Sequence, residues 1–226
     1  MSRNSGARPT PEVPWGIGKR CATYRELNRW NLGQPEHDIL SVMPLRRSVL
    51  IHLVGPGGAG KSTVGLALAT RLGIAFIDLD VQFKARAGDI TVYLHANGYD
   101  AYAERSVRVY LQARAGLQES AVIALSSGFM TYDPDVHPAY VELRAQIARD
   151  PMTFVLLPSL DYEACVRETV RRQMSRPFSR SAEREEEVIR QRFGQYHQLP
   201  AKKVETLQPV DAVVDGLLGH VGPMID

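Results

Sequence analysis

The sequence predicts an α/β fold in which a parallel sheet of five strands lies between two layers of helices. Three observations support this prediction. Short apolar runs rich in β-branched residues alternate with helical stretches, a pattern typical of a parallel sheet covered on both faces. A glycine-rich segment follows the first run and opens a helix. The 226 residues, with 27 basic and 25 acidic side chains, suit one globular domain and an appendage.

Each expected element has its own pattern. The strands are apolar runs too short for helices, at 49–54, 74–78, 121–125, 153–157 and, briefly, 204–206. The helices are expected over 61–72, 81–87, 91–97, 101–119, 138–149, 161–173, 183–196 and 210–220. Residues 1–45 lack this regularity and hold several prolines, so they form a partly flexible N-terminal extension to a domain at 46–226.

Composition excludes several classes of protein. Cys21 and Cys165 are too few for a disulfide framework or a cysteine metal site. No apolar run is long enough to cross a bilayer, and the first residues lack a secretory signal, so we expect a cytoplasmic protein without a membrane partner. The net charge of +2 gives no general attraction to nucleic acid.

Arginine is unevenly distributed along the chain. Eight arginines and no lysine fall between Arg167 and Arg192. A GC-rich genome would explain a high arginine content but not this cluster. The planar guanidinium matches phosphate and carboxylate oxygens, so the cluster indicates an anionic ligand.

The segment from Gly55 to Ser62 fits the pattern G-x-x-x-x-G-K-S/T, between a strand and a helix, and predicts the P-loop NTPase fold. Glycines let backbone N–H groups surround a β-phosphate, and the helix N-terminus adds partial positive charge. Lys61 is expected to reach the β- and γ-phosphates, and the Ser62 hydroxyl to bind Mg²⁺. The predicted nucleotide-binding residues of this loop are Gly55, Gly57, Gly58, Ala59, Gly60, Lys61, Ser62 and Thr63.

Two carboxylates follow the second expected strand, at Asp78 and Asp80. They fall at the carboxyl edge of the sheet, where open α/β sheets bind ligands. We expect Asp78 to hold Mg²⁺ through water, and Asp80 to accept or orient the proton of an attacking hydroxyl. The alternative is that one of them only caps the following helix.

From about residue 46 to 218 the chain resembles shikimate kinase and its relatives among the P-loop small-molecule kinases. The resemblance rests on the phosphate loop, the D-x-D pair at Asp78 and Asp80, an arginine-proline pair at 176–177 and R-x-x-x-Y from Arg192 to Tyr196. It implies a mobile lid at about 174–182 that brings Arg176 onto the nucleotide as a catalytic residue. It also implies that Arg167 packs near the nucleotide and that Arg192 holds an anionic group of the acceptor.

The lid composition agrees with a mobile loop, because residues 174–182 hold serines, a proline and two arginines. Closure would exclude water and bring Arg176, with Arg180 a weaker candidate, to the transferring phosphate. The alternative is a solvated connection whose arginines pair with the acidic residues that follow. The run from Glu185 to Glu187 is expected to be the solvated start of a helix.

Two departures from the family pattern concern the acceptor. The family has a shikimate-binding arginine where this chain has Ala103, and a glycine triplet where it has Ser126, Ser127 and Gly128. Loss of one charge-assisted contact costs about 1.5–3 kcal/mol, or roughly 10- to 150-fold in affinity. Arg105 is a poor replacement, because two positions along a helix turn it about 200° away.

Together these features predict an ATP-dependent kinase that moves the γ-phosphate of ATP to a hydroxyl of a small anionic molecule other than shikimate. Its catalytic residues would be Lys61, Asp80 and Arg176, its acceptor contacts Asp80 and Arg192, and its Mg²⁺ contacts Ser62 and Asp78. We expect a monomer or homodimer that binds ATP and ADP. One alternative is a nucleotide- or ligand-binding regulatory domain without turnover; another is a kinase acting on a nucleotide-sugar, an antibiotic or a macromolecule.

Overall fold

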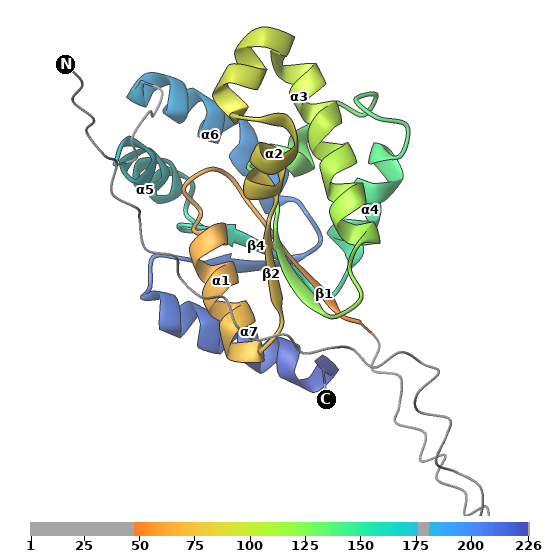
Figure 1. Ribbon diagram of the computed structural model, residues 1–226. Coiled ribbons are helices and arrows are strands. Elements are labelled where there is room, and N and C mark those ends of the chain that lie inside the picture. The colour runs from red at the N-terminus through yellow and green to blue at the C-terminus, as the bar shows by residue number, and fades with distance from the viewer. Residues whose placement is uncertain (1–47, 176–180, 226) are drawn as a thin grey trace, which may run out of the picture. The chain divides into compact units, whose positions relative to one another are not determined.

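The structure is a computed structural model that describes residues 48–175 and 181–225. The predicted extension at 1–45 and most of the predicted lid, including Arg176 and Arg180, lie outside these residues. The strands are β1 (Leu50–Val54), β2 (Ala75–Asp78), β3 (Ala121–Ala124), β4 (Thr153–Leu157) and β5 (Lys202–Glu205). They form one parallel sheet in the order β2-β3-β1-β4-β5 (Figure 1). The predicted five-stranded α/β architecture is thus confirmed.

Helices alternate with these strands along the chain. They are α1 (Lys61–Leu72), α2 (Leu79–Ala87), α3 (Ile90–Ala115), α4 (Tyr140–Arg149), α5 (Tyr162–Met174), α6 (Ala182–His197) and α7 (Val210–Ile225), with a 3₁₀ turn, η2, at Phe129–Thr131. None of the helices in the described ranges is long and apolar enough to cross a bilayer.

Two element boundaries differ from the prediction. The helices expected at 91–97 and 101–119 form one element, α3, with a kink at Gly98, whose φ of 83° suits glycine. β5 runs over 202–205 instead of 204–206, because Lys202 and Lys203 pair with β4. Lysine is common on edge strands, where it faces solvent and discourages pairing with other chains.

The strands bury side chains on both faces, which produces the three layers. Alternate residues of β1, β3 and β4 pack against α1 and α7: Ile51, Leu53, Val122, Phe154 and Leu156. The other face of the sheet packs against α3, α4, α5 and α6. It does so through apolar residues of the strands and of the position just after β3: Val54, Ile123, Leu125, Val155 and Leu157. Figure 1 shows α1 and α7 side by side on one side of the sheet.

The carboxyl ends of β1, β2 and β3 meet at one edge of the sheet. Gly55 leaves β1 with φ 147°, and a Cβ there would lie 2.2 Å from the Leu156 carbonyl oxygen. Only glycine fits at this close approach to β4. The same edge carries Asp78 at the end of β2 and Ser126 just after β3. The fold therefore brings the start of the phosphate loop, Asp78 and Ser126 to one edge of the sheet.

Candidate active site

The phosphate loop joins β1 to α1 and is held by its own lysine. Lys61 is 9% exposed, and its Nζ donates to the carbonyl oxygens of Gly55 and Pro56, both at 2.8 Å. Gly60 caps α1 with φ 86° and no side-chain hydrogen bond, and no acidic residue occupies the first turn. The N-terminal amides of α1 thus face a cavity of about 110 Å³, an arrangement suited to an anion.

The two carboxylate oxygens of Asp78 accept hydrogen bonds from different parts of the site. Oδ1 accepts from the backbone N–H groups of Asp80 and Val81, at 2.9 and 3.2 Å, and so caps α2. Oδ2 accepts from the Ser62 hydroxyl at 2.5 Å. The capping alternative therefore describes Asp78, and the cap also directs the second oxygen toward the phosphate loop.

Ser62 and Asp78 are the oxygen donors that a Mg²⁺ ion would meet at this loop. Mg²⁺ in phosphate-transferring sites commonly takes one or two protein oxygens, with water and phosphate as its other ligands. Within the described ranges, no group of three His, Cys, Asp or Glu side chains is placed to hold a metal. The residues fit an ion that arrives with the nucleotide.

Asp80 has a different environment from Asp78. Its Oδ1 accepts a hydrogen bond of 2.6 Å from the hydroxyl of Ser126, a residue only 2% exposed. Asp80 does not cap α2; instead it borders both the 110 Å³ cavity of the phosphate loop and a larger cavity of about 310 Å³. A carboxylate is thus held where the two cavities meet.

The larger cavity lies between α3, α5, α6 and the segment after β3. It shares four residues with the phosphate cavity: Gly57, Asp80, Ser127 and Gln173. Its apolar walls include Ile90, Leu94, Tyr99, Tyr102, Val188 and Ile189. Arg192 lies in the same wall, so the structure brings together the two side chains predicted to contact the acceptor.

The R-x-x-x-Y motif joins α6 to the segment after β3. Residues four apart lie on the same side of a helix. The Tyr196 hydroxyl donates to the Ser127 carbonyl at 2.8 Å, and Arg192 Nη1 reaches the same oxygen at 3.5 Å. Arg192 Nη2 also donates to the Tyr99 hydroxyl at 3.0 Å. Burial raises the pKa of Tyr196, so its hydroxyl stays a donor at neutral pH.

Gly128 retains one glycine of the family's triplet for a steric reason. A Cβ at this position would lie 2.6 Å from the Tyr99 hydroxyl and 3.2 Å from Arg192 Nη2. The other expected departure from the family pattern concerns Ala103 and Arg105 on α3. Ala103 is 1% exposed, and Arg105 donates to the Arg86 carbonyl at 3.3 Å rather than lining the cavity. Arg105 does not replace the missing arginine.

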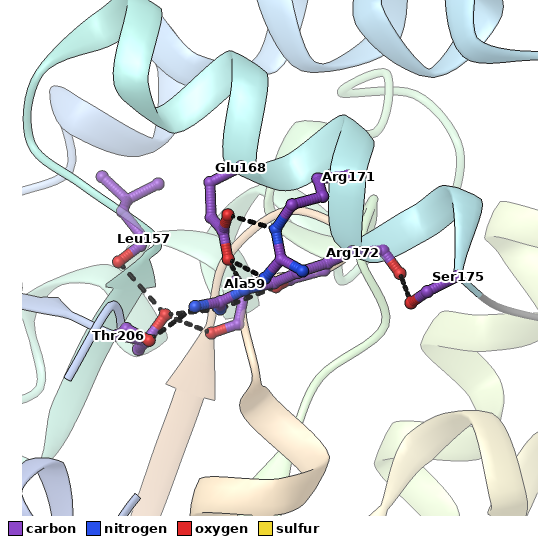
Figure 2. Close-up of polar contacts among 8 residues, drawn as sticks. Ala59, Leu157, Glu168, Arg171, Arg172, Ser175 and Thr206 are labelled. Carbon is purple, nitrogen blue, oxygen red and sulfur yellow. Dashed lines mark hydrogen bonds and ion pairs between the residues drawn. The ribbon is translucent and has the colours of Figure 1, made fainter. Parts of the chain in front are cut away.

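Arg172, which the sequence reasoning did not select, packs against the phosphate loop (Figure 2). Its Nη1 donates to the Gly58 carbonyl at 3.1 Å and to Thr206 Oγ1 at 3.0 Å, and its Nη2 donates to the Thr206 carbonyl at 2.7 Å. Arg167 is exposed on α5. Its nucleotide contact stays a prediction, and Arg172 of the same helix contacts the phosphate loop.

The carboxylate of Glu168 fixes the Arg172 guanidinium. Glu168 Oε1 accepts from Arg172 Nε at 2.6 Å, and Figure 2 shows Arg171 on the same carboxylate. Hydrogen bonds from Arg171 and then Arg172 lower the pKa of Glu168 to about 2. Arg172 and residues 208–210 line one cavity of about 390 Å³.

Glu185 corrects an expectation. It was assigned to the solvated start of α6, but it is 9% exposed and lines the 310 Å³ cavity. Position 185 shares a helix face with Ile189, Arg192 and Tyr196, all of which turn toward the domain. Glu186 and Glu187 face outward and pair with Arg190 and Arg184. The period of a helix places Glu185 on a different face from Glu186 and Glu187, so the helical pattern could have predicted that these residues differ in burial.

Comparison with known proteins identifies what this arrangement is similar to. A family model described as shikimate kinase matches residues 57–218. Shikimate kinase of Bradyrhizobium diazoefficiens is 32% identical over 157 residues, which cover 69% of this chain and 68% of that protein. Shikimate kinase of Histophilus somni is 42% identical over 79 residues, but that alignment covers only 43% of its length.

Solved structures show the same fold. Shikimate kinase from Acinetobacter baumannii, in complex with shikimate, aligns with a TM-score of 0.62 at 21% identity, over 80% of this chain and 97% of that one. A gluconokinase from Sinorhizobium meliloti aligns with a TM-score of 0.51 at 13% identity, over 80% of this chain and 94% of that one.

Proposed function

The chain belongs to the shikimate kinase family and is a phosphotransferase acting on a hydroxyl, and we propose that its acceptor is a small anionic molecule other than shikimate. The observation that carries this proposal is the position of Asp80. Its carboxylate borders the phosphate cavity and the larger cavity at once. A hydroxyl in the larger cavity would meet Asp80 on its way to a γ-phosphate at the loop.

The proposed transfer depends mainly on positioning and charge. Lys61 and the amides of α1 hold the β- and γ-phosphates, and Ser62 and Asp78 would hold the Mg²⁺ that neutralises phosphate charge. Asp80, oriented by the Ser126 hydroxyl, accepts or orients the proton of the attacking hydroxyl. Family resemblance adds Arg176 as the lid residue that stabilises the developing charge.

The base of the nucleotide would occupy the 390 Å³ cavity behind the loop. Arg172 there is held by Glu168 and by Thr206, so its guanidinium has little freedom. The flat guanidinium on one side and Pro209 on another offer surfaces against which an aromatic base can stack. The triphosphate would then extend from this cavity along the loop toward Lys61.

Two features of the 310 Å³ cavity, the acceptor cavity of this proposal, support a substrate other than shikimate. Ala103 removes the arginine that the family uses to hold the shikimate carboxylate, and Arg192 is the guanidinium that lines the cavity among the described residues. Ser126 has a side chain where the family has glycine, and that side chain is committed to Asp80. An anionic group on the acceptor would bind Arg192.

Calorimetry and an ADP-release assay test the kinase proposal together. The wild-type chain should bind ATP in the presence of Mg²⁺, and a panel of hydroxylated small molecules should contain compounds that stimulate ADP release. The same stimulation should disappear in Asp80→Asn. Nucleotide binding without stimulation by any hydroxyl compound would instead favour the regulatory domain without turnover.

A further inference from the structure

Glu185 presents a carboxylate to the acceptor cavity and forms no ion pair with any residue that the structure describes. The residue is 9% exposed, and its Oε2 accepts one hydrogen bond of 3.2 Å from the neutral amide of Gln173. Across residues 48–175 and 181–225, no lysine, arginine or histidine lies within ion-pair distance of it. A buried carboxylate without an ion pair costs free energy, so a ligand that brings a cation to Glu185 would be stabilised there.

Among the glutamates of α5 and α6, the buried Glu185 and the exposed Glu183 form no ion pair within the described residues. Glu163 and Glu168 on α5, and Glu186 and Glu187 on α6, are each paired with an arginine. These two helices are rich in arginine, yet none of the described arginines forms an ion pair with Glu185. The N-terminal turn of α6 favours a negative charge at this position.

The balance of charge in the cavity indicates what it accepts. Its described lining contains two carboxylates, Asp80 and Glu185, and one guanidinium, Arg192. Arg192 is already hydrogen bonded to the Tyr99 hydroxyl and the Ser127 carbonyl. If the acceptor carried only a negative charge, that charge and the two carboxylates would outnumber the one guanidinium. The cavity would then hold excess negative charge beside the phosphate loop. A positive group on the acceptor corrects this imbalance.

We therefore propose that Glu185 binds a protonated amino group of the acceptor, so that the substrate is an amino-bearing hydroxyl compound whose anionic group faces Arg192. This inference rests on the proposed kinase function and narrows its substrate class. The apolar side chains Leu94, Val188 and Ile189 line the same cavity as Glu185 and could contact the carbon skeleton of such a compound. A neutral hydroxyl would satisfy the geometry but leave the buried charge uncompensated.

Matched compounds that differ in one amino group test the inference. We would use 4-hydroxybutyrate with homoserine, gluconate with 2-amino-2-deoxygluconate, and glucose with glucosamine, each with Mg²⁺ and ATP. Binding is followed by thermal shift, and transfer by ADP release. The proteins are the wild type, Glu185→Gln, which keeps the oxygen that accepts from Gln173, and Glu187→Gln as a control at the exposed ion pair of the same helix.

The inference predicts that the amino member of at least one pair binds the wild type and Glu187→Gln about 10-fold tighter or more than its partner, as for a charge-assisted hydrogen bond. Glu185→Gln should lose this preference. The inference is overturned if no amino compound binds better than its partner, including the case in which none binds, or if Glu185→Gln keeps the preference. ATP binding in the same samples reports separately on the kinase proposal.

Discussion

The site has two halves: the cavity at the phosphate loop (the phosphate half) and the larger cavity (the acceptor half). They differ in the groups that make the contacts. In the phosphate half, backbone groups make the contacts: the amides of α1 face the cavity, and Lys61 is fixed by two backbone carbonyls. In the acceptor half, side chains from distant elements make them, including Asp80 from α2, Tyr99 from α3 and Arg192 from α6. A backbone site tolerates little change, whereas a side-chain site changes its ligand through single substitutions.

This difference explains where the chain departs from its family. The phosphate loop keeps every residue of the family pattern, and Gly55 shows why, since any side chain there would overlap the β4 backbone. The resemblance implies departures in the acceptor half at Ala103 and Ser126, and both residues are buried in the fold. Family membership therefore fixes the phosphate donor more firmly than the acceptor.

The largest expected effect falls on the phosphate half. Lys61→Ala should abolish most ATP binding and most turnover, because it removes both a phosphate contact and the clamp on the loop. Calorimetry with Mg²⁺ and ATP measures this. Lys84→Ala, at an exposed lysine of α2, is the control and should bind like the wild type. Equal affinity of Lys61→Ala and Lys84→Ala would contradict the assignment of the loop.

Asp80→Asn should lower turnover without weakening ATP binding, which would distinguish the acceptor half from the phosphate half. Because Asp80 acts on the acceptor hydroxyl, ATP affinity should stay within about threefold of the wild type, whereas kcat with a stimulating acceptor should fall by about 10²-fold or more. Calorimetry and steady-state kinetics give the two values. If the variant loses ATP binding as Lys61→Ala does, then Asp80 belongs to the nucleotide half.

Arg192→Ala should raise the KM for the acceptor by about 10- to 150-fold, the size of one charge-assisted contact, with less effect on kcat. ATP affinity should not change, because Arg192 contacts Ser127 and Tyr99 on the acceptor side. Arg190→Ala, on the outer face of the same helix, is the matched control. An acceptor KM that is the same in both variants would remove Arg192 from the acceptor contacts.

Ser126→Ala should have the smallest effect. The hydroxyl only orients Asp80, so we expect kcat to fall by about 3- to 10-fold, the net value of one hydrogen bond. The double variant with Asp80→Asn should be no worse than Asp80→Asn alone, because the two side chains act as one unit. Additive losses in that double-mutant cycle would mean that Ser126 acts independently of Asp80.

Local sequence predicted the fold and the phosphate half because both depend on short-range patterns. The order of elements and the loop from Gly55 to Ser62 follow from periodicity and glycine spacing. The helix break at Gly98 was expected, but its continuation as one kinked element was not. The start of β5 was missed because lysines at 202 and 203 conceal an edge strand.

The acceptor half was predicted only in part, because it depends on which helix faces turn inward. The place of Asp80 after the second strand predicted its role, and the family resemblance predicted that of Arg192, but the sequence predicts a solvated Glu185, which lines the cavity instead. The contact of Arg172 with the phosphate loop was not predicted, because only the packing of α5 against the loop distinguishes this arginine from Arg167 on the same helix. Contacts between distant elements, such as Ser126 with Asp80, leave no local pattern in the sequence.

The claim that the acceptor half has changed its ligand can be tested directly with shikimate. ADP release is measured with Mg²⁺ and ATP over rising, millimolar shikimate, with an active shikimate kinase as the positive control in the same assay. The departures at Ala103 and Ser126, and the unpaired carboxylate of Glu185, predict that the rate stays at its basal value. A saturable increase in ADP release with shikimate would contradict the account.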